Sequence, residues 1–343
     1  MANHDQIDAL TASHERELSE ALADAYSELL AGFELNAIAS SLDDIDPDHI
    51  RDQLELILNL HDRGVPEPFE RRADKIADKL ESFILAIAAL AAAQAGHTIN
   101  DRDAKLADAR QAARAFGNHL VAETALQISA AIEAAIVGRG STDARAEQFR
   151  RSIGLSPKQA DSLEAMRLAL KQHVATPRRL LPATMNTDGV RTPARYTRTT
   201  KTRPIIAGLR GRVSAAQLRL VVKALANADL SQADANQLLD RHAAALRSFR
   251  INAVAGEAMH ELAESAKLAG WQTAQHYGAL PANQRRFWQT AEDERVRHTH
   301  SQVSELNPQG VQLGEPFETP FGPRMNAPLE WGCRCRATLW PKR

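Results

Sequence analysis

The stretch PEPFERRADKIADKLESFILAIAALAAAQAG, residues 66–96, decides the fold class of this chain. Its apolar residues recur at alternating steps of four and three, the spacing of one face of an α-helix. They are Phe69, Ala73, Ile76, Leu80, Phe83 and Ile87. Gly96 is expected to end the helix. The stretch is therefore predicted to be a long helix with one buried face.

The sequence on either side continues this pattern, so residues 1–173 are predicted to form a helical N-terminal domain. Leu18, Leu22, Ala25 and Leu29 form one apolar stripe. Further helices are expected from Asp46-Pro47 toward Gly64, from about Asn100 to about Val137, and from Ser156-Pro157 through Leu170. Two of them begin with a capping residue followed by proline, which suits the first turn of a helix.

Residues 174–212 interrupt the helices. Four prolines and three glycines exclude a long helix there, and Arg191 to Arg203 is rich in Thr and Arg. We interpret 174–212 as a basic linker or binding arm, because structureless loops of this length are uncommon in compact domains. Residues 213–270 are predicted to be a helical connector, with caps at Ser214 and Ser231 and an end at Gly270.

The last residues, 271–343, have a different composition. All four tryptophans and both cysteines lie there, which predicts a separate small core. We expect a strand at 286–289, a helix that begins at Thr290 with Asp293 in its first turn, and short strands and turns over 310–328. The fold class is therefore predicted as mainly α: an elongated multi-helix body with a small C-terminal α+β domain.

Composition and charge limit the possible functions. The chain has 343 residues, 44% of them apolar, and a net charge of −1, so any attraction to DNA must be local. Residues 1–100 carry 20 acidic against 7 basic residues, whereas residues 174–223 carry 11 basic residues against Asp188 alone. The most apolar run, 83–95, is shorter than the roughly 20 residues that span a bilayer. We expect no membrane partner and no secretion signal, hence synthesis in the cytoplasm.

The densest polar cluster is Glu292-Asp293-Glu294-Arg295-Val296-Arg297-His298-Thr299-His300, followed later by Cys333-Arg334-Cys335. A zinc site would use His298, His300, Cys333 and Cys335, but two histidines two apart and a Cys-x-Cys pair lack the usual ligand spacing. A metal-dependent nuclease or hydrolase would use Asp293, Glu294, His298 or Glu305. On a helix, Asp293 with Arg297 and Glu294 with His298 would instead form surface ion pairs. We expect no catalytic residue, no bound metal and no cofactor.

The basic arm is a second candidate site. Its residues are Arg191, Arg195, Arg198, Lys201 and Arg203, preceded by Arg178 and Arg179. They could neutralise phosphates without reading sequence, because one aromatic residue, Tyr196, is a poor stacking platform. An acidic protein surface, or the acidic N-terminal half of the chain, would serve equally well as the partner.

Several C-terminal motifs occur in a fixed order. They are Trp288-x₄-Asp293-x-Arg295-Val296-Arg297-x₂-His300, Glu315-Pro316-Phe317, Pro320-x-Gly322, Pro328 and Cys333-Arg334-Cys335. In this order they resemble the C-terminal domain of Mu F-like minor head proteins, well over 286–337 and loosely over 150–343. The chain departs from the family at Asn252–Glu257, where an Arg-Thr-Glu-like element is usual, and at Ser301–Glu305, where a short glycine loop is usual.

The resemblance implies a minor capsid protein of a tailed phage or prophage that acts in head morphogenesis and in genome packaging or delivery. Implied partners are the portal protein, the major capsid or scaffolding protein, and packaged double-stranded DNA. The implied location is the virion, inside the head near the portal, after assembly in the host cytoplasm. Trp288, Asp293, Arg295, Arg297, His300, Cys333 and Cys335 would hold the fold or form a docking surface. The alternatives are the metal-dependent hydrolase and a non-specific DNA-binding accessory protein.

Overall fold

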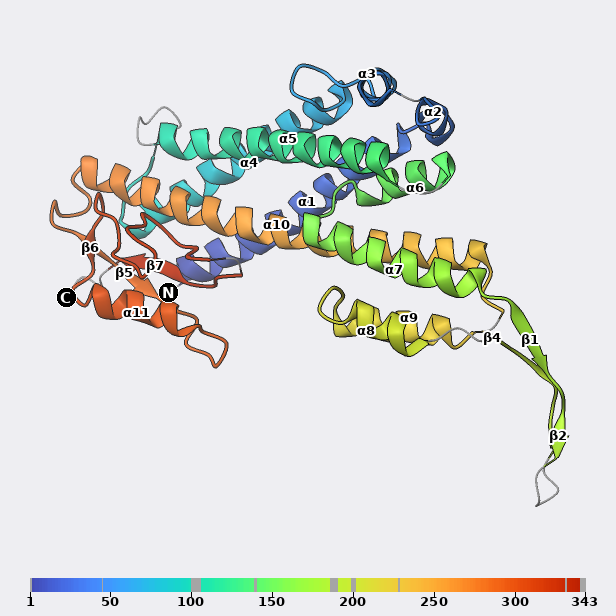
Figure 1. The fold of residues 1–343 in the computed structure, drawn as a ribbon. Coiled ribbons are helices and arrows are strands. Elements are labelled where there is room, and N and C mark those ends of the chain that lie inside the picture. The colour runs from blue at the N-terminus through green and yellow to red at the C-terminus, as the bar shows by residue number, and fades with distance from the viewer. Residues whose placement is uncertain are drawn as a thin grey trace. The chain divides into compact units, whose positions relative to one another are not determined.

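The computed structural model describes residues 2–44, 46–99, 106–138, 141–185, 191–198, 202–227, 229–330 and 332–339 (Figure 1). The chain is mainly α, as the helical spacing predicted. Its contacts divide it into two compact units. Unit 1 comprises Met1–Gly32, Leu58–Leu126 and Arg250–Arg343, and unit 2 comprises Phe33–Ile57 and Gln127–Phe249.

Unit 1 is built around helix α4 (Glu67–Gln94), the helix of the stretch quoted above. All six predicted apolar positions are buried, none exposed by more than 4%. Helix α1 (Ala2–Ala31) packs along α4, with the ring of Tyr26 against that of Phe69. The predicted amphipathic helix is confirmed, and it ends just before Gly96, which adopts a positive φ of 78°.

Helix α5 (Leu106–Val137) contributes to both units. Its segment Arg110–Val137 is long and apolar enough to cross a membrane by length and composition alone. Core helices of soluble proteins meet the same criterion, so the observation is weak evidence for a membrane. In this chain α5 buries one face, including Leu120, Ile128 and Ile132.

Helix α10 (Gln232–His276) also contributes to both units, and it corrects one prediction. Gly270 does not end this helix, which continues through it to His276. A Cβ at Gly270 would lie 2.3 Å from the carbonyl oxygen of Ala88 and 3.0 Å from the Cβ of Ala91. The glycine therefore lets α10 approach the backbone of α4 closely. Glycine in a helix has a second use, close contact, that the sequence pattern does not distinguish from termination.

Unit 2 consists mainly of short helices. They are α2 (Leu35–Ser41), α3 (Pro47–Ile57), α6 (Thr142–Ser152), α7 (Pro157–Ala175), α8 (Thr202–Leu209) and α9 (Ala215–Leu225). The predicted starts at Ser156 and Ser214 are confirmed. Each serine forms a capping box with the glutamine three residues later. Apolar residues of α7, α8, α9 and the first part of α10 share one core, centred on Met166, Leu170 and Val221.

A two-stranded hairpin accounts for much of 174–212. Its strands are β1 (Arg178–Leu181), β2 (Thr184–Met185), β3 (Arg191–Thr192) and β4 (Arg195–Arg198), with β1 paired to β4 and β2 to β3, both antiparallel. Leu180 and Met185 are more than half exposed, so the described part of the hairpin has no core of its own. The next described element, helix α8, begins at Thr202.

The C-terminal part of unit 1 contains a three-stranded antiparallel sheet of order β6-β5-β7. The elements are β5 (Arg285–Gln289), α11 (His298–Leu306), β6 (Val311–Gln312) and β7 (Arg336–Leu339). The predicted strand at 286–289 is confirmed, and β7 was not predicted. The predicted helix start at Thr290 is wrong, because the helix begins at His298.

The reason for the later start lies in residues 290–297. Glu292 has a positive φ of 55°, which interrupts a helix. The Asp293 carboxylate accepts a hydrogen bond from the backbone N–H of Arg295, two residues on. Asp293 thus closes a local turn, an alternative that aspartate offers to helix capping. Residues 290–297 are thus not helical, so the helical spacing that would have paired Asp293 with Arg297 and Glu294 with His298 does not apply. Asp293 pairs with Arg334, and Arg297 lies 3.9 Å from Glu330.

The tryptophan-rich core exists, but it is not separate from the helical body. Trp288, Phe317, Leu313 and both cysteines pack in one cluster with residues of α10 and α4. Trp271 of α10, at 0% exposure, is the largest of its fully buried side chains. The small sheet therefore needs the two long helices to complete its core.

The close approach at Gly270 gives a stability prediction. Gly270→Ala should lower the stability of unit 1 by about 2 kcal/mol, because the new methyl group overpacks against α4. Helix propensity alone would give a gain of about 1 kcal/mol. Gly256→Ala is the matched control in the same helix, since its Cβ would meet only the flexible carboxylate of Glu15. Thermal unfolding followed by circular dichroism measures both, and a Gly270→Ala protein more stable than wild type would contradict the packing argument.

Candidate functional site

Strand β5 presents two of its side chains to the core. Arg286 and Trp288 alternate with partly exposed neighbours, as expected for a half-buried strand. The ring of Trp288 meets Phe317 edge to face at 5.3 Å, and the guanidinium of Arg286 lies over the same ring at 4.6 Å. Two of the ordered motifs, Trp288 and Glu315-Pro316-Phe317, therefore contact each other directly.

Arg286 is fully buried and forms no ion pair with a carboxylate of the described residues. Its guanidinium donates hydrogen bonds to the backbone carbonyls of Glu315 and Met325 and to the side-chain oxygen of Asn326. Burial lowers the pKa of Arg286 to about 10. Arg286 thus holds the irregular segment 310–328 in place, because it donates hydrogen bonds to carbonyls that are not paired in a β-sheet.

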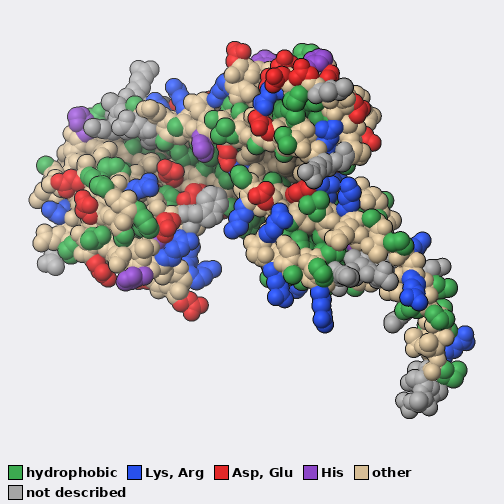
Figure 2. All heavy atoms as spheres, in the orientation of Figure 1, with side chains coloured by type: hydrophobic (Ala, Val, Ile, Leu, Met, Phe, Trp, Pro, Cys, Tyr) green, Lys and Arg blue, Asp and Glu red, His purple; other side chains and the backbone are tan. Residues whose placement is uncertain are grey.

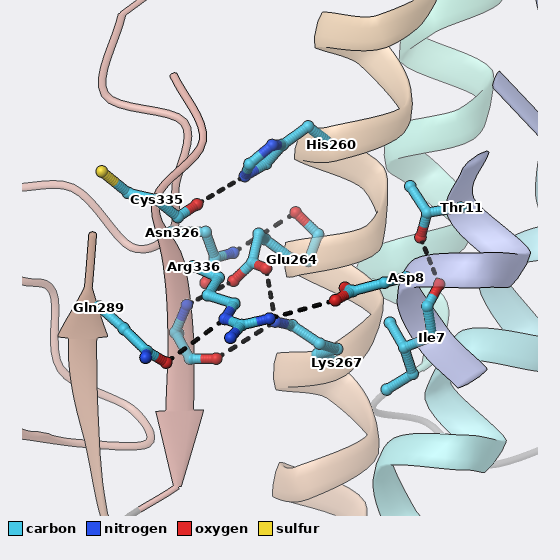
Figure 3. Close-up of polar contacts among 12 residues, drawn as sticks. Ile7, Asp8, Thr11, His260, Glu264, Lys267, Gln289, Asn326, Cys335 and Arg336 are labelled. Carbon is cyan, nitrogen blue, oxygen red and sulfur yellow. Dashed lines mark hydrogen bonds and ion pairs between the residues drawn. The ribbon is translucent and has the colours of Figure 1, made fainter. Parts of the chain in front are cut away.

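Helix α10 turns a polar face toward the segment that carries the two cysteines (Figure 3). Glu257, His260, Glu264 and Lys267 lie three and four residues apart, so they share one side of the helix. Each contacts main-chain atoms of residues 332–337. Glu257 accepts from the N–H of Gly332 at 3.1 Å, and His260 Nε2 lies 2.7 Å from the carbonyl oxygen of Cys335. Burial raises the pKa of Glu257.

Glu264 and Lys267 bind the two main-chain groups of one residue, Ala337. The Glu264 carboxylate accepts from its N–H at 2.8 Å, and the Lys267 ammonium donates to its carbonyl at 3.2 Å. The two side chains are also paired with each other at 2.5 Å and are 5% and 3% exposed. Because β7 is an edge strand, this pair supplies the hydrogen bonds that a further strand would otherwise give.

His300 and the two cysteines form a buried cluster. His300 lies in the first turns of α11, and Cys333 and Cys335 immediately precede β7. The imidazole Nδ1 lies 3.5 Å from Cys333 Sγ and 3.4 Å from Cys335 Sγ. The opposite nitrogen, Nε2, lies 3.2 Å from a carboxylate oxygen of Glu330. Both cysteines are free thiols, and the three side chains are 3%, 6% and 2% exposed.

The two thiols titrate very differently. The hydrogen bond from Cys335 lowers the pKa of Cys333 to about 5, helped by the backbone N–H groups of Leu329 and Cys335. The pKa of Cys335 is raised, because it holds that shared proton and is buried, although the indole N–H of Trp288 opposes the rise. Burial and hydrogen bonding therefore favour the thiolate form at Cys333 and the thiol form at Cys335.

The exposed motif residues lie around this cluster. Asp293 pairs with Arg334, the residue between the cysteines, at 2.7 Å, and this hydrogen bond lowers the pKa of Asp293. Arg297 lies 3.9 Å from Glu330, the carboxylate that also contacts His300. The seven motif residues thus divide in two. Trp288, His300, Cys333 and Cys335 are buried, whereas Asp293, Arg295 and Arg297 are exposed.

The residues proposed for a metal-dependent hydrolase do not converge on one site. Glu294, His298 and Glu305 are exposed, and Asp293 is engaged by Arg334. His300, Cys333 and Cys335 lie close enough together to hold one metal ion. Among the described residues they are the group of three or more His, Cys, Asp or Glu side chains for which this is true. His298, the fourth residue of the zinc set considered from the sequence, is not part of it.

A polar hollow of about 370 Å³ lies beside the α10 face. Residues of α1, α10, the 289–292 turn and the start of β7 line it. Two charged pairs lie in its lining, Arg336 with Asp8 at 3.1 Å and Lys267 with Glu264 (Figure 3). Arg334, which also lines it, pairs with Asp293 outside the hollow. We therefore interpret the hollow as part of the interface at which β7 packs against α1 and α10, and not as a ligand site.

The basic-arm residues are only partly described. Arg178, Arg179, Arg191 and Arg203 are exposed. Arg195 and Arg198 lie in β4, but their side chains, like the whole of Lys201, fall outside the described residues. Figure 2 shows blue Lys and Arg side chains along the hairpin.

Several contributing residues were not identified from the sequence: His260, Glu264, Lys267, Arg286 and Glu330. Four polar residues at helical spacing, from Glu257 to Lys267, were a usable signal, because so regular a polar stripe beside apolar residues indicates a second packed surface. No local pattern marks Arg286 or Glu330. Their partners are 29 to 40 residues away in the chain.

The buried pair in α10 gives a second stability prediction. Glu264→Gln keeps an oxygen for Ala337 but leaves the Lys267 charge unpaired, so it should cost about 3–5 kcal/mol. Adding Lys267→Met should recover part of this loss. Glu67→Gln, which disrupts the exposed pair with Arg71, is the matched control and should cost under about 0.5 kcal/mol. Chemical denaturation measures all three, and equal effects of Glu264→Gln and Glu67→Gln would disprove the assigned role.

Comparisons with protein-family models, curated proteins and solved structures found no match to this chain. The resemblance to Mu F-like minor head proteins therefore stays a prediction carried by the ordered motif residues.

Proposed function

We propose that this chain is a minor head protein of a tailed phage or prophage, associated with the portal and acting in head morphogenesis and genome packaging or delivery. The observation that carries the proposal is the convergence of the ordered motifs. Residues separated by up to 47 positions, from Trp288 to Cys335, pack in one small domain. Motifs that recur in a family for a shared fold are expected to meet in this way.

The division of the motif residues supports a structural role over a catalytic one. The buried members form a core, and the exposed members, Asp293, Arg295 and Arg297, lie on the single segment between β5 and α11. Exposed charges on an ordered loop suit recognition of another protein. In this proposal the loop contacts the portal or a neighbouring head protein, and the chain is not an enzyme.

Copy number in the particle tests the assignment. Quantitative mass spectrometry of DNA-emptied heads from the source phage or induced prophage should find this chain at a level comparable with the portal and far below the major capsid protein. Its presence in procapsids would extend the role to assembly. Absence from both heads and procapsids would rule the assignment out.

A single substitution tests the docking loop. Arg295→Ala should leave the circular dichroism spectrum and melting temperature unchanged, because this side chain is largely exposed, yet reduce incorporation into procapsids. Arg324→Ala, another exposed arginine of the same domain outside the motif residues, should have no effect on incorporation. Normal incorporation of Arg295→Ala would remove the loop from the proposed interface.

A second candidate function, non-specific DNA binding, is favoured by the hairpin. Its described residues, 178–185 and 191–198, include five arginines and no acidic residue. A two-stranded β-ribbon is narrow enough to enter the major groove of DNA. This activity would suit a protein located where packaged DNA enters the head.

The salt dependence of binding tests this second function. Fluorescence anisotropy with a duplex of arbitrary sequence should show affinity falling steeply with salt. Arg179→Ala/Arg191→Ala should reduce the log–log slope by about 2. Arg71→Ala/Arg114→Ala, which removes two exposed arginines outside the hairpin, should leave the slope unchanged. Salt-insensitive binding, or equal slopes for the two double variants, would contradict a role for the hairpin.

A further inference from the structure

The His300 cluster has the geometry of a metal site. In a tetrahedral zinc site the sulfur ligands lie about 2.3 Å and the nitrogen ligand about 2.0 Å from the ion, so nitrogen and sulfur are about 3.5 Å apart. The observed distances from His300 Nδ1 to the two sulfurs are 3.5 and 3.4 Å. All three ligand atoms lie within 4.8 Å of one another. The set therefore fits around one ion with little movement.

The tight Cys-x-Cys spacing is not an obstacle here. Both sulfurs approach the same imidazole nitrogen, although one residue alone separates the cysteines. The backbone N–H of Cys335 lies 3.4 Å from the sulfur of Cys333 and donates to it. The carbonyl of Cys335 is in turn held by His260 of α10. The main chain is thus fixed so that the two side chains point to one place.

The surroundings of His300 select the right tautomer for ligation. Glu330 accepts the Nε2 hydrogen of the imidazole, which leaves the Nδ1 lone pair directed at the two sulfurs. A carboxylate behind the ligating histidine is the usual outer-shell arrangement of zinc sites. The hydrogen on Nε2 is assigned from this contact.

An independent observation comes from Trp288. Its indole N–H has no hydrogen-bond partner among the described residues, although the side chain is 95% buried. Buried polar groups in native proteins nearly always have a partner. A thiolate ligand, or a water molecule bound to a metal at this place, would satisfy the indole.

We propose that His300, Cys333 and Cys335 bind one zinc ion, with a water molecule in the fourth position. The ion would join the first turns of α11 to the segment that enters β7, two parts of the chain 33 to 35 residues apart. The inference does not depend on the proposed function in phage heads. It replaces the expectation, based on ligand spacing, of no bound metal.

A nucleophilic cysteine assisted by His300 is the competing interpretation. It would need a sulfur that substrate can reach, but both cysteines are at least 94% buried. It would also leave the second thiol, at the same distance from the imidazole, without a role. Zinc ligation uses all three groups.

Metal content of the full-length chain tests the proposal. Protein purified under reducing conditions from zinc-supplemented cells should contain about one zinc ion per chain, measured by inductively coupled plasma mass spectrometry. Exchange with cobalt should produce thiolate-to-cobalt charge transfer and the ligand-field bands of a tetrahedral site. Cys335→Ser and His300→Gln should each lose the metal, whereas His298→Gln, the exposed histidine two residues away, should retain it.

The ligand variants could lose the metal because they do not fold, so a variant that keeps all three ligands is also needed. Glu330→Gln should fold and bind zinc about 10–100-fold more weakly, because it removes only the carboxylate behind His300. Folded wild-type protein with less than about 0.1 zinc per chain and no cobalt bands would overturn the proposal. Equal zinc affinity of wild type and His300→Gln would also overturn it.

Discussion

The C-terminal domain depends on one interface, the polar face of α10 against the free edge of β7. An edge strand exposes main-chain donors and acceptors that must find partners. In this chain the side chains of Glu264 and Lys267 bind both main-chain groups of Ala337, and His260 binds the carbonyl of Cys335. The three-stranded sheet is too small to be stable alone, so this interface and the shared core with α10 hold it in place.

The same interface determines where the cysteines lie. Cys333 and Cys335 are in the segment that α10 holds from Gly332 to Ala337, and they face His300 on the other side. The position of His300 depends in turn on α11, which Ser304 anchors to the carbonyl of Trp288 in β5. The cluster is thus assembled by three elements, and its geometry follows from packing and not from the spacing of its residues.

Buried charge is concentrated in this small domain. The two terminal nitrogens of Arg286 donate to carbonyl and amide oxygens, whereas its Nε has no partner among the described residues. Glu264 and Lys267 pair with each other and with the main chain of Ala337. Buried ionic groups are costly to desolvate and contribute little net stability, so their value is in specifying one arrangement. The hairpin of unit 2 is the opposite case. Among its described arginine side chains Arg179 and Arg191 are exposed and Arg178 pairs with Asp229, and no core holds the described part of the hairpin, which suits a surface that is completed by a partner.

The sequence by itself determined the mainly α class, the long buried face of α4, the helix caps at Ser156 and Ser214 and the strand at β5, because these depend on local periodicity and local hydrogen bonds. It also identified His300, Cys333 and Cys335 as candidates. Tertiary structure decided that Gly270 continues a helix, that Asp293 closes a turn before α11, and that His298 lies outside the cluster. The first and third outcomes depend on contacts between distant segments, which a local sequence pattern does not contain. The turn at Asp293 is a local hydrogen bond that competes with helix capping by the same side chain.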